Sequence, residues 1–456
     1  MSLARVLLAQ WRAARPLADG KALNAGRLHV LDALGVGLAA STLDQGETYR
    51  RFAEALTTGP AILLANGKTA SASDAALVNG GLIHSLEFDD THTASIVHGS
   101  AVLLPAALAA AQASGVSSEA MLASYIKGWE AMIRIGLAAQ GGFQRRGFQI
   151  TSVAGSMIAA MIAADVMGAN DDQTVAAIGI ALSQASGVFE FLSNGSSVKS
   201  MHPGWAAHAG LIAAQLAMAG MGGPETAFEG SRGLFKAFTA DGVGAERFAS
   251  ELADFGSVWH INDAAFKFVP SCHYLHPFVE GARLLTEQGV SVATIDNVVL
   301  RIAEGAAPIV CEPWDIKLKP RDGHAARWSL PIVVAEQFVH GRVDLETFTR
   351  RADDRVRALA ARMIWEKLEP HRFPHVFEAE LIVNLTDGSV HSIRLDDVFG
   401  NASRPAGDDA VLQKFRANVK RALRPGSADD LITWGYSIER GATLEELNRI
   451  MSRRLP

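Results

Sequence analysis

The sequence has few cysteines, no basic stretch and no long uninterrupted apolar run. Cys272 and Cys311 are its only cysteines, too few for a disulfide framework and consistent with a reducing cytoplasm. The net charge of −6 argues against nucleic acid as a partner. Apolar runs such as 101–115, which Pro105 interrupts, are shorter than the roughly 20 residues that cross a bilayer. Residues 1–21 show no secretory signal pattern, so we expect a cytoplasmic protein with no membrane partner.

What the sequence does contain is mostly helical pattern. From about 22 to 267, apolar residues recur at spacings of three and four, as in 24–41 and 151–170. Many Ala and Gly positions in these segments indicate helices that pack closely and are buried on several sides. The chain of 456 residues is long enough for two domains, because single cores stop growing at roughly 250–300 residues.

The pattern changes after residue 268. Residues 290–310 are rich in β-branched side chains, and 375–397 alternate apolar and polar residues on both sides of Asp387-Gly388, a strong hairpin signal. Residues 326–348 and 355–370 read as helices, and the tail from 400 returns to helix. The sequence therefore predicts a mainly α protein, with a large helical domain from 1–267 and 400–456 and an inserted α+β domain at 268–399.

Four polar clusters interrupt the apolar helices, at 84–100, 145–155, 193–210 and 263–277. Three of them lie at or just before a predicted helix N-terminus, where free N–H groups and the helix dipole favour anions. The sequence has no GxxxxGK[ST] loop and no strand–GxGxxG–helix unit, which disfavours a nucleotide. Together with two lysines and several histidines, this predicts a small carboxylate as ligand.

Each cluster also has a simpler interpretation. His84 and His92 could be exposed surface residues, and Lys199 could be a solvated loop lysine. His202 could do no more than bond a backbone carbonyl. Lys267 differs, because it lies between two phenylalanines and burial lowers a lysine pKa toward the range of a base.

A metal site is a rival interpretation of the first cluster. Its candidate ligands are His84, Asp89, Asp90, His92 and His98. No HExxH or paired CxxC spacing is present, and nearby lysines would repel a cation. We therefore expect no metal, and we expect the aspartates to cap a helix or orient a neighbour.

The clusters together resemble the MmgE/PrpD family, which includes 2-methylcitrate dehydratase, cis-aconitate decarboxylase and iminodisuccinate epimerase. The segments that carry the resemblance follow the family's order, at 79–109, 181–187, 198–217, 222–235, 266–277 and 320–335. The resemblance implies a helical domain from both chain ends with an inserted α+β domain, and an active site in the cleft between them. It also implies a homodimer that needs no organic cofactor.

Carried over from the family, the active-site pattern falls on Thr91, His98, Lys199 and Lys267. We expect His98, Lys199 and Lys267 to transfer protons and stabilise an enediolate. The remaining pocket residues are predicted from the clusters as Glu87, Asp90, Thr91, Gln149, His202 and His273.

Two positions depart from the family pattern and bear on the reaction. Glu87 stands where many members have aspartate, and Gln149 where several have histidine. Because glutamine does not readily donate a proton, its presence favours epimerisation of an iminodisuccinate-like dicarboxylate, which needs only proton removal and return. Dehydration of a 2-methylcitrate-like acid and decarboxylation of a cis-aconitate-like acid are the alternatives, since another histidine could serve as acid. A non-catalytic carboxylate-binding member is a third.

Overall fold

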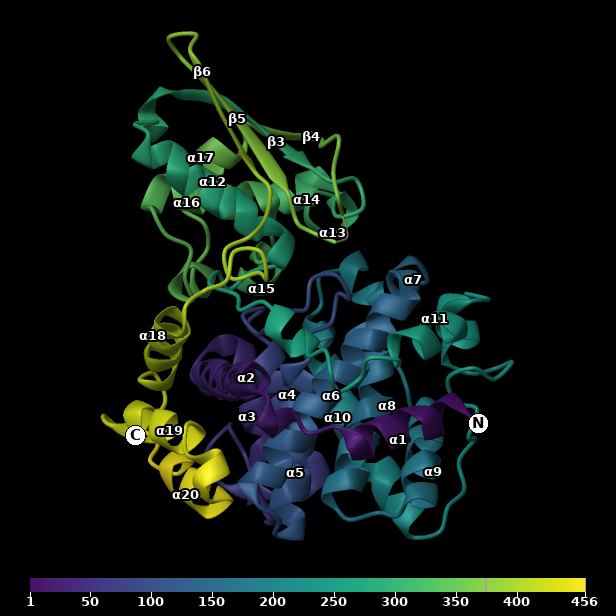
Figure 1. Cartoon of the computed structure of the whole chain (residues 1–456). Helices are drawn as coiled ribbons and strands as arrows, with labels where there is room; N and C mark the ends of the chain where they lie inside the picture. Colours follow the sequence, from purple (N-terminus) through teal and green to yellow (C-terminus); the bar gives the residue numbers. More distant parts are fainter. Residues whose placement is uncertain (374, 456) are drawn as a thin grey trace.

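The computed structural model describes residues 1–373 and 375–455, and the fold is mainly helical (Figure 1). We call the elements before residue 252 and after residue 407 the helical part. Its helices are α1 (Leu3–Ala13), α2 (Gly20–Ala40), α3 (Glu47–Glu54), α4 (Ala72–His84), α5 (Ser100–Ser114), α6 (Ser118–Ala139), α7 (Gly142–Arg145), α8 (Ile150–Val166), α9 (Asp171–Leu182), α10 (Met201–Met218), α11 (Gly244–Glu251), α18 (Asp408–Val419), α19 (Ser427–Gly435) and α20 (Leu444–Met451). A small antiparallel pair, β1 (Ala61–Ile62) and β2 (Thr69–Ala70), lies between α3 and α4.

The elements from 276 to 395 form what we call the sheet part. They are α12 (His276–Glu287), β3 (Ile295–Ile302), α13 (Ala307–Val310), α14 (Trp314–Leu318), α15 (Gly323–Ala326), α16 (Leu330–His340), α17 (Asp354–Ala360), β4 (Met363–Lys367), β5 (Ala379–Leu385) and β6 (Val390–Leu395). The strand order is β4-β3-β5-β6, with β3 and β4 parallel and the other pairs antiparallel.

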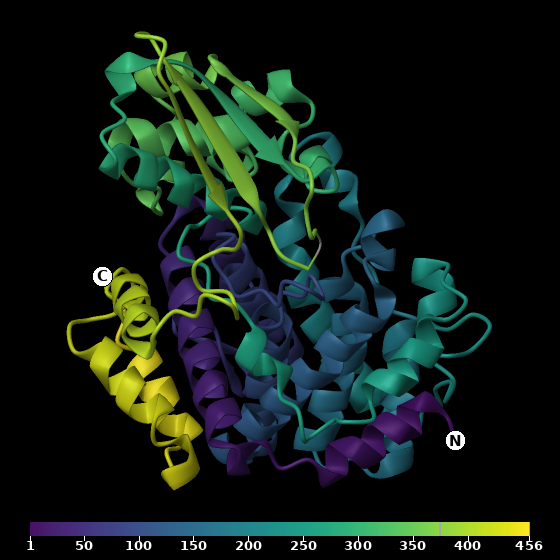
Figure 2. The same ribbon diagram turned by 45° about the horizontal axis from the view of Figure 1, so that its top comes forward.

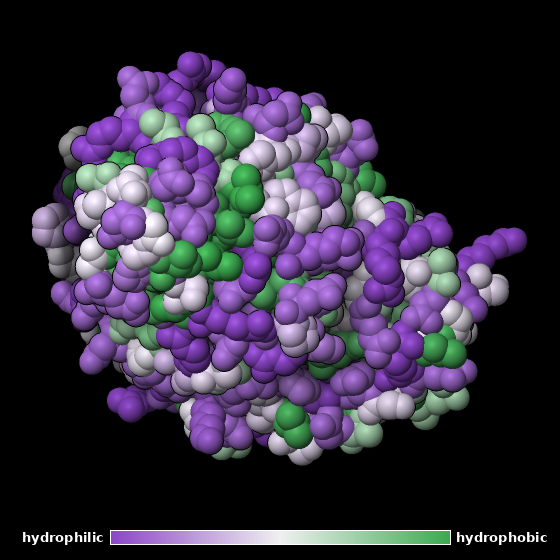
Figure 3. Space-filling model, turned by 90° about the horizontal axis from the view of Figure 1, so that it is seen from above, coloured by the Kyte–Doolittle hydropathy of each residue, from purple (hydrophilic) through white to green (hydrophobic). Residues whose placement is uncertain are grey.

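The sheet is covered by helices on one face and solvated on the other. Along β5, Ala379, Leu381 and Val383 are buried and alternate with less buried residues, the pattern of a sheet with one core face. Helix α12 packs against β5 and β6, and a Cβ on its Gly281 would lie 2.6 Å from Leu381 Cδ1. In Figure 2 the helices of the sheet part lie behind the strands. Seen from above, the surface of the molecule is mostly hydrophilic with a small apolar area (Figure 3).

Two large hydrophobic clusters account for most of the core. One is built almost entirely from residues 4–264 and 415–451, and the other from residues 272–398. Helix α18 packs beside α2, so the end of the chain returns to the first helices (Figures 1 and 2). The division into a discontinuous helical domain and an inserted α+β domain stays a prediction, and these clusters are consistent with it.

The structure confirms one local prediction and corrects another. The predicted hairpin is present, since β5 and β6 pair on either side of Gly388, whose φ of 85° suits glycine. The predicted helix over 355–370 is wrong beyond α17, because Met363–Lys367 form β4 and pair in parallel with β3. Pairing with β3 at the sheet edge outweighs the helical preference of this sequence.

Close helix contacts at glycines bring two polar clusters together. Gly80 of α4 faces Gly204 of α10, and a Cβ on Gly80 would lie 2.6 Å from the Gly204 Cα. Only glycine permits this approach. The contact brings the C-terminal end of α4, which carries His84, against the first turn of α10, which carries His202.

Within residues 1–373 and 375–455, no helix combines the length and the apolar character that a bilayer-spanning segment needs.

Candidate active site

The loop between α4 and α5 is held against the segment that carries Lys267. Thr91 and Ala265 exchange two backbone hydrogen bonds, with N···O distances of 3.0 and 2.8 Å. Two residues of this loop have left-handed backbones, Glu87 with φ 52° and Ile96 with φ 58°. Such conformations cost non-glycine residues about 1–3 kcal/mol each and concentrate at functional sites. Both side chains line the cavity described below.

Glu87 lies between the two lysines that the sequence predicts. Lys199 Nζ donates to Glu87 Oε1, and Lys267 Nζ lies 3.7 Å from Glu87 Oε2. Glu87 is 2 % exposed and Lys267 0 % exposed. Burial raises the pKa of Glu87, but the charges of Lys199 and Lys267 outweigh it and bring the pKa to about 2. Glu87 is therefore an ionised carboxylate at neutral pH.

The two lysines differ in their remaining contacts. Lys199 Nζ also lies 4.3 Å from the ring centroid of Trp328, a cation–π contact. Lys267 Nζ has no hydrogen-bond partner among the residues that the structure describes. Lys199 is 5 % exposed, so the solvated-loop interpretation is wrong. Of the two ammonium groups, Lys267 has the greater unused capacity to donate.

His98 is placed to act as a base. Its Nδ1 lies 3.1 Å from the Asp90 carbonyl oxygen and 2.9 Å from Thr91 Oγ1. Because a carbonyl only accepts, Nδ1 carries the proton and Nε2 keeps its lone pair. Its backbone N–H donates to Thr151 Oγ1 at 3.0 Å, which ties it to α8. Burial, and then the charge of Lys267, hold the pKa of His98 well below its ordinary value, so the ring is neutral.

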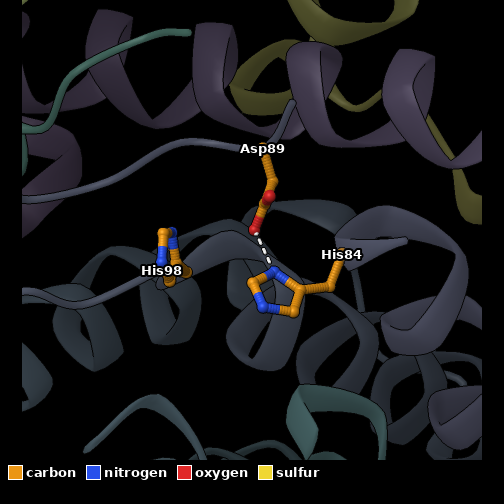
Figure 4. A group of neighbouring side chains, drawn as sticks. All are labelled: His84, Asp89 and His98. Carbon is orange, nitrogen blue, oxygen red and sulfur yellow. Dashed lines mark hydrogen bonds and ion pairs between the residues drawn. The ribbon is translucent and has the colours of Figure 1, made fainter. Parts of the chain in front are cut away.

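A second histidine lies beside it and is paired with an aspartate. His84 Nδ1 lies 2.7 Å from Asp89 Oδ2, and the rings of His84 and His98 are 5.0 Å apart (Figure 4). His84 is 1 % exposed, so it is not the surface residue that the sequence also allowed. Burial raises the pKa of Asp89. His84 and Lys267 favour the ionised carboxylate more strongly, so this pKa lies far below its usual value.

His84, Asp89 and His98 are close enough to consider as metal ligands. One ligand atom from each lies within 4.8 Å of the others. However, Asp89 and His84 are bonded to each other, His98 uses Nδ1 on Asp90 and Thr91, and Lys267 acts on both Asp89 and His98. A group with a buried ammonium at this range suits an anion better than a cation.

Asp90 is turned away from this group. Its carboxylate accepts from Ser100 N at 3.1 Å, near the start of α5, and Oδ2 lies 2.8 Å from His29 Nδ1. It is therefore one of the capping and orienting aspartates that the sequence suggested, and its side chain is not part of the cavity lining. The prediction that Asp90 lines the pocket does not match this position.

A cavity of about 640 Å³, including its open mouth, lies where these groups meet the sheet part. Six predicted residues line it: Glu87, Thr91, His98, Gln149, Lys199 and His273. Lys267 and His202 are not among the lining residues, but Lys267 Nζ lies 3.7 Å from Glu87 Oε2, and His202 bonds the lining residue Gln149. The helical part thus supplies Glu87, His98 and Lys199, and the segment that joins it to the sheet part supplies Lys267 and His273.

His273 stands out because it is buried without partners. It is 4 % exposed, and neither ring nitrogen has a hydrogen-bond partner within residues 1–373 and 375–455. Burial, with the nearby His276 and Lys267, holds the pKa of His273 well below its ordinary value. Its neighbour Cys272 also lines the cavity, and burial raises the pKa of that thiol to about 11, which makes it a poor nucleophile at neutral pH.

Sequence reasoning missed the apolar wall and one positioning residue. Phe191, Trp328 and Phe377 line the cavity, two of them from segments far along the chain from the lysines. Arg327 is fully buried and donates from Nη1 to the carbonyl oxygens of Leu86 and Pro270, at 2.6 and 2.7 Å. It therefore holds together the segments that carry Glu87 and Lys267. The motif at 320–335 contains Arg327, but nothing in its spacing indicates these contacts.

Comparisons with known proteins identify the family of the chain. The N-terminal domain of the MmgE/PrpD family matches residues 7–244, and the C-terminal domain of that family matches residues 269–433. Human cis-aconitate decarboxylase is 29% identical over 377 residues, 78% of this chain and 75% of the relative. The mouse cis-aconitate decarboxylase is 26% identical over 462 residues, 95% and 90% of the two chains. The cis-aconitate decarboxylase-like protein oryM of Aspergillus oryzae is 26% identical over 408 residues, 84% and 82%. The chain belongs to the MmgE/PrpD family.

Proposed function

We propose that this chain is a cofactor-independent lyase of a small di- or tricarboxylate. The observation that carries the proposal is Lys267, a fully buried ammonium group without a hydrogen-bond partner among the described residues, next to the neutral ring of His98. A buried charge is costly unless it is paired and hydrogen-bonded. A substrate carboxylate would supply the partner that Lys267 lacks.

The neighbouring groups suit chemistry at the carbon next to that carboxylate. As negative charge develops there, Lys267 and Lys199 stabilise it in a site with little water, where such interactions are strongest. Glu87 holds Lys199 in place through their hydrogen bond. His98 Nε2, which has a free lone pair, exchanges a proton with the reacting carbon.

Decarboxylation is the form of lyase chemistry that the relatives suggest, since all three are named for cis-aconitate decarboxylase. In that reaction the bond between carbon and one carboxylate breaks, CO2 leaves, and the electron pair stays on the carbon chain. Protonation of the carbon chain completes it. Because the ring of His98 is neutral, it first takes this proton from solvent and then delivers it through Nε2.

Epimerisation, which the sequence favoured through Gln149, has no support from the relatives reported above. Their names indicate lyases, so the lyase alternative replaces epimerisation as the leading interpretation. The homodimer and the cytoplasmic location stay predictions.

One experiment separates these reactions. The protein is incubated in deuterated water with cis-aconitate, 2-methylcitrate or iminodisuccinate, and proton NMR follows the products while CO2 is measured. We expect CO2 and an unsaturated dicarboxylate carrying deuterium from cis-aconitate, or an alkene from the hydroxylated acid. Deuterium at the α-carbon of iminodisuccinate with loss of optical purity and no CO2 would instead establish the epimerase. Binding without any turnover or exchange would point to the non-catalytic member.

A further inference from the structure

Gln149 occupies the N-cap position of α8, but its side chain caps nothing. Its backbone is fixed on both sides, since its N–H donates to Gly187 O at 2.9 Å and its carbonyl accepts from Ser152 N at 3.0 Å. The side chain instead lies between two histidines. Gln149 Nε2 is 3.4 Å from His84 Nε2, and Gln149 Oε1 bonds His202 Nδ1.

The two ends of the amide face different histidines. The amide nitrogen, which can only donate, is the atom on the His84 side, and the amide oxygen, which can only accept, is the atom on the His202 side. His84 is in turn held by Asp89 through its Nδ1. On the other side, His202 Nδ1–H donates to the amide oxygen. The Gln149 amide is therefore fixed at its oxygen by His202 and has its nitrogen on the side of His84.

This orientation leaves one group of the amide for the cavity. The oxygen of Gln149 faces His202, and one N–H faces His84. The second N–H has no acceptor in residues 1–373 and 375–455. Gln149 is 4 % exposed and lines the cavity, so this N–H is available to a ligand there.

We propose that Gln149 determines specificity by presenting a hydrogen-bond donor, and no acceptor, to the substrate, and that His202 is a positioning residue that fixes this polarity. The inference rests on the proposed function and deepens it. The matching substrate group is an unprotonated oxygen of a second carboxylate, separate from the carboxylate at Lys267. The substrate is therefore at least a dicarboxylate, and the group facing Gln149 receives no proton during the reaction.

The test is a double-mutant cycle between positions 149 and 202, read as KM and kcat on the acid that the wild-type protein turns over. Gln149→Met removes the donor, and we expect KM to rise by about 30-fold with kcat within about threefold, as for a lost hydrogen bond to a charged group. His202→Phe frees the amide to turn, and we expect about a 10-fold rise in KM. The KM of the double variant should be no higher than that of Gln149→Met alone, because His202 acts only through Gln149.

Two further variants control for structural effects. His202→Asn keeps a donor near the position of Nδ1, and we expect KM within about threefold of the wild-type value. Gln337→Met replaces another glutamine that is 4 % exposed but lies outside the site, and it should leave KM unchanged. The inference is overturned if the increases in KM from the changes at 149 and 202 multiply in the double variant. It is also overturned if His202→Asn raises KM as much as His202→Phe does. If His202→Phe does not fold, His202→Asn and Gln149→Met decide alone.

A binding readout separates this inference from the proposed function. Tricarballylate, a saturated tricarboxylate with no double bond, is titrated into each protein by calorimetry. If no acid is turned over, the lyase proposal fails, yet the same pattern of dissociation constants would still support the donor role of Gln149. If turnover occurs but tricarballylate binds the wild-type and Gln149→Met proteins equally, the donor role is wrong and the lyase stands.

Discussion

Two buried lysines near the same loop have opposite surroundings. Lys414 of α18 donates to Asp32 Oδ2 at 3.0 Å and to the Phe88 carbonyl oxygen at 2.8 Å, and it lies 4.0 Å from the ring centroid of Phe88. Lys267 has an ion-pair contact with Glu87 at 3.7 Å and no hydrogen-bond partner among the described residues. One ammonium group is satisfied by the protein, and the other is not.

The difference shows how a structural charge can be told from a functional one. A buried lysine that only joins two helices should have its donors filled, because unfilled donors cost free energy. Lys414 meets this expectation between α2 and α18. Lys267 does not, and it contacts Glu87, which lines the cavity. Both ring nitrogens of His273, another lining residue, also lack partners among the residues that the structure describes. Unused capacity in the folded protein marks where a ligand completes the structure.

We expect the largest change in activity when Lys267 is replaced with methionine. We expect kcat/KM to fall by about 1,000-fold, because the variant loses a preorganised charge at the reacting carboxylate. Stability should stay the same or increase, since an incompletely paired buried charge is removed. Turnover followed by NMR measures the change in kcat/KM, and unfolding in urea measures the change in stability. Activity within tenfold of wild type would show that Lys267 is not catalytic.

The matched replacement, Lys414→Met, should have the reverse effect. It leaves Asp32 buried without its partner, so we expect the free energy of unfolding to fall by about 3–5 kcal/mol. The folded fraction should keep kcat/KM within about threefold. Unfolding in urea measures the loss of stability. The double variant Lys414→Met/Asp32→Asn should be more stable than Lys414→Met alone. If Lys414→Met keeps its stability but loses turnover, Lys414 is not a purely structural charge and the two lysines do not differ in the way described.

The histidines of the site extend the comparison to pH. Burial lowers the pKa of His202 to about 4 and holds those of His98 and His273 well below the ordinary value near 6.5. Below pH 6.5 the unfolded chain binds protons at these rings and the folded chain does not. The free energy of unfolding should therefore decrease as pH falls from 6.5 toward 4, by up to about 3 kcal/mol for His202 alone. Urea titrations across this pH range should show that the free energy of unfolding decreases less in His202→Asn than in the wild-type protein.

A smaller effect is expected at the apolar wall of the cavity. Phe377→Ala removes a ring that lines the cavity from the sheet part, and we expect KM to rise by about 10-fold with kcat nearly unchanged. A ring that only confines the substrate contributes equally to ground and transition states. A loss confined to kcat would mean that the sheet part also takes part in the chemistry.

Part of this site could be predicted from the sequence. The resemblance indicated Lys199 and Lys267, and the two phenylalanines beside Lys267 indicated its burial. The direction of Asp89 and Asp90 could not be predicted, because adjacent residues of an irregular loop face opposite ways and only their partners, His84 and His29, decide which faces the site.

Other features depend on contacts between segments far apart in the chain. Phe377 and Trp328 reach the cavity only because the sheet part lies against the helical part, and no local pattern signals it. The mainly helical character and the hairpin at Gly388 were predictable from local signals. Strand β4 was not, because it depends on pairing with β3.

The role of Lys267 as a carboxylate ligand is tested most directly by the binding of tricarballylate to wild-type protein and to Lys267→Met, measured by calorimetry at pH 7.5. If Lys267 is the unfilled donor of a carboxylate site, the dissociation constant should rise by at least about 30-fold in the variant, as expected for a lost charged hydrogen bond. Equal dissociation constants for the two proteins would show that Lys267 does not bind the carboxylate.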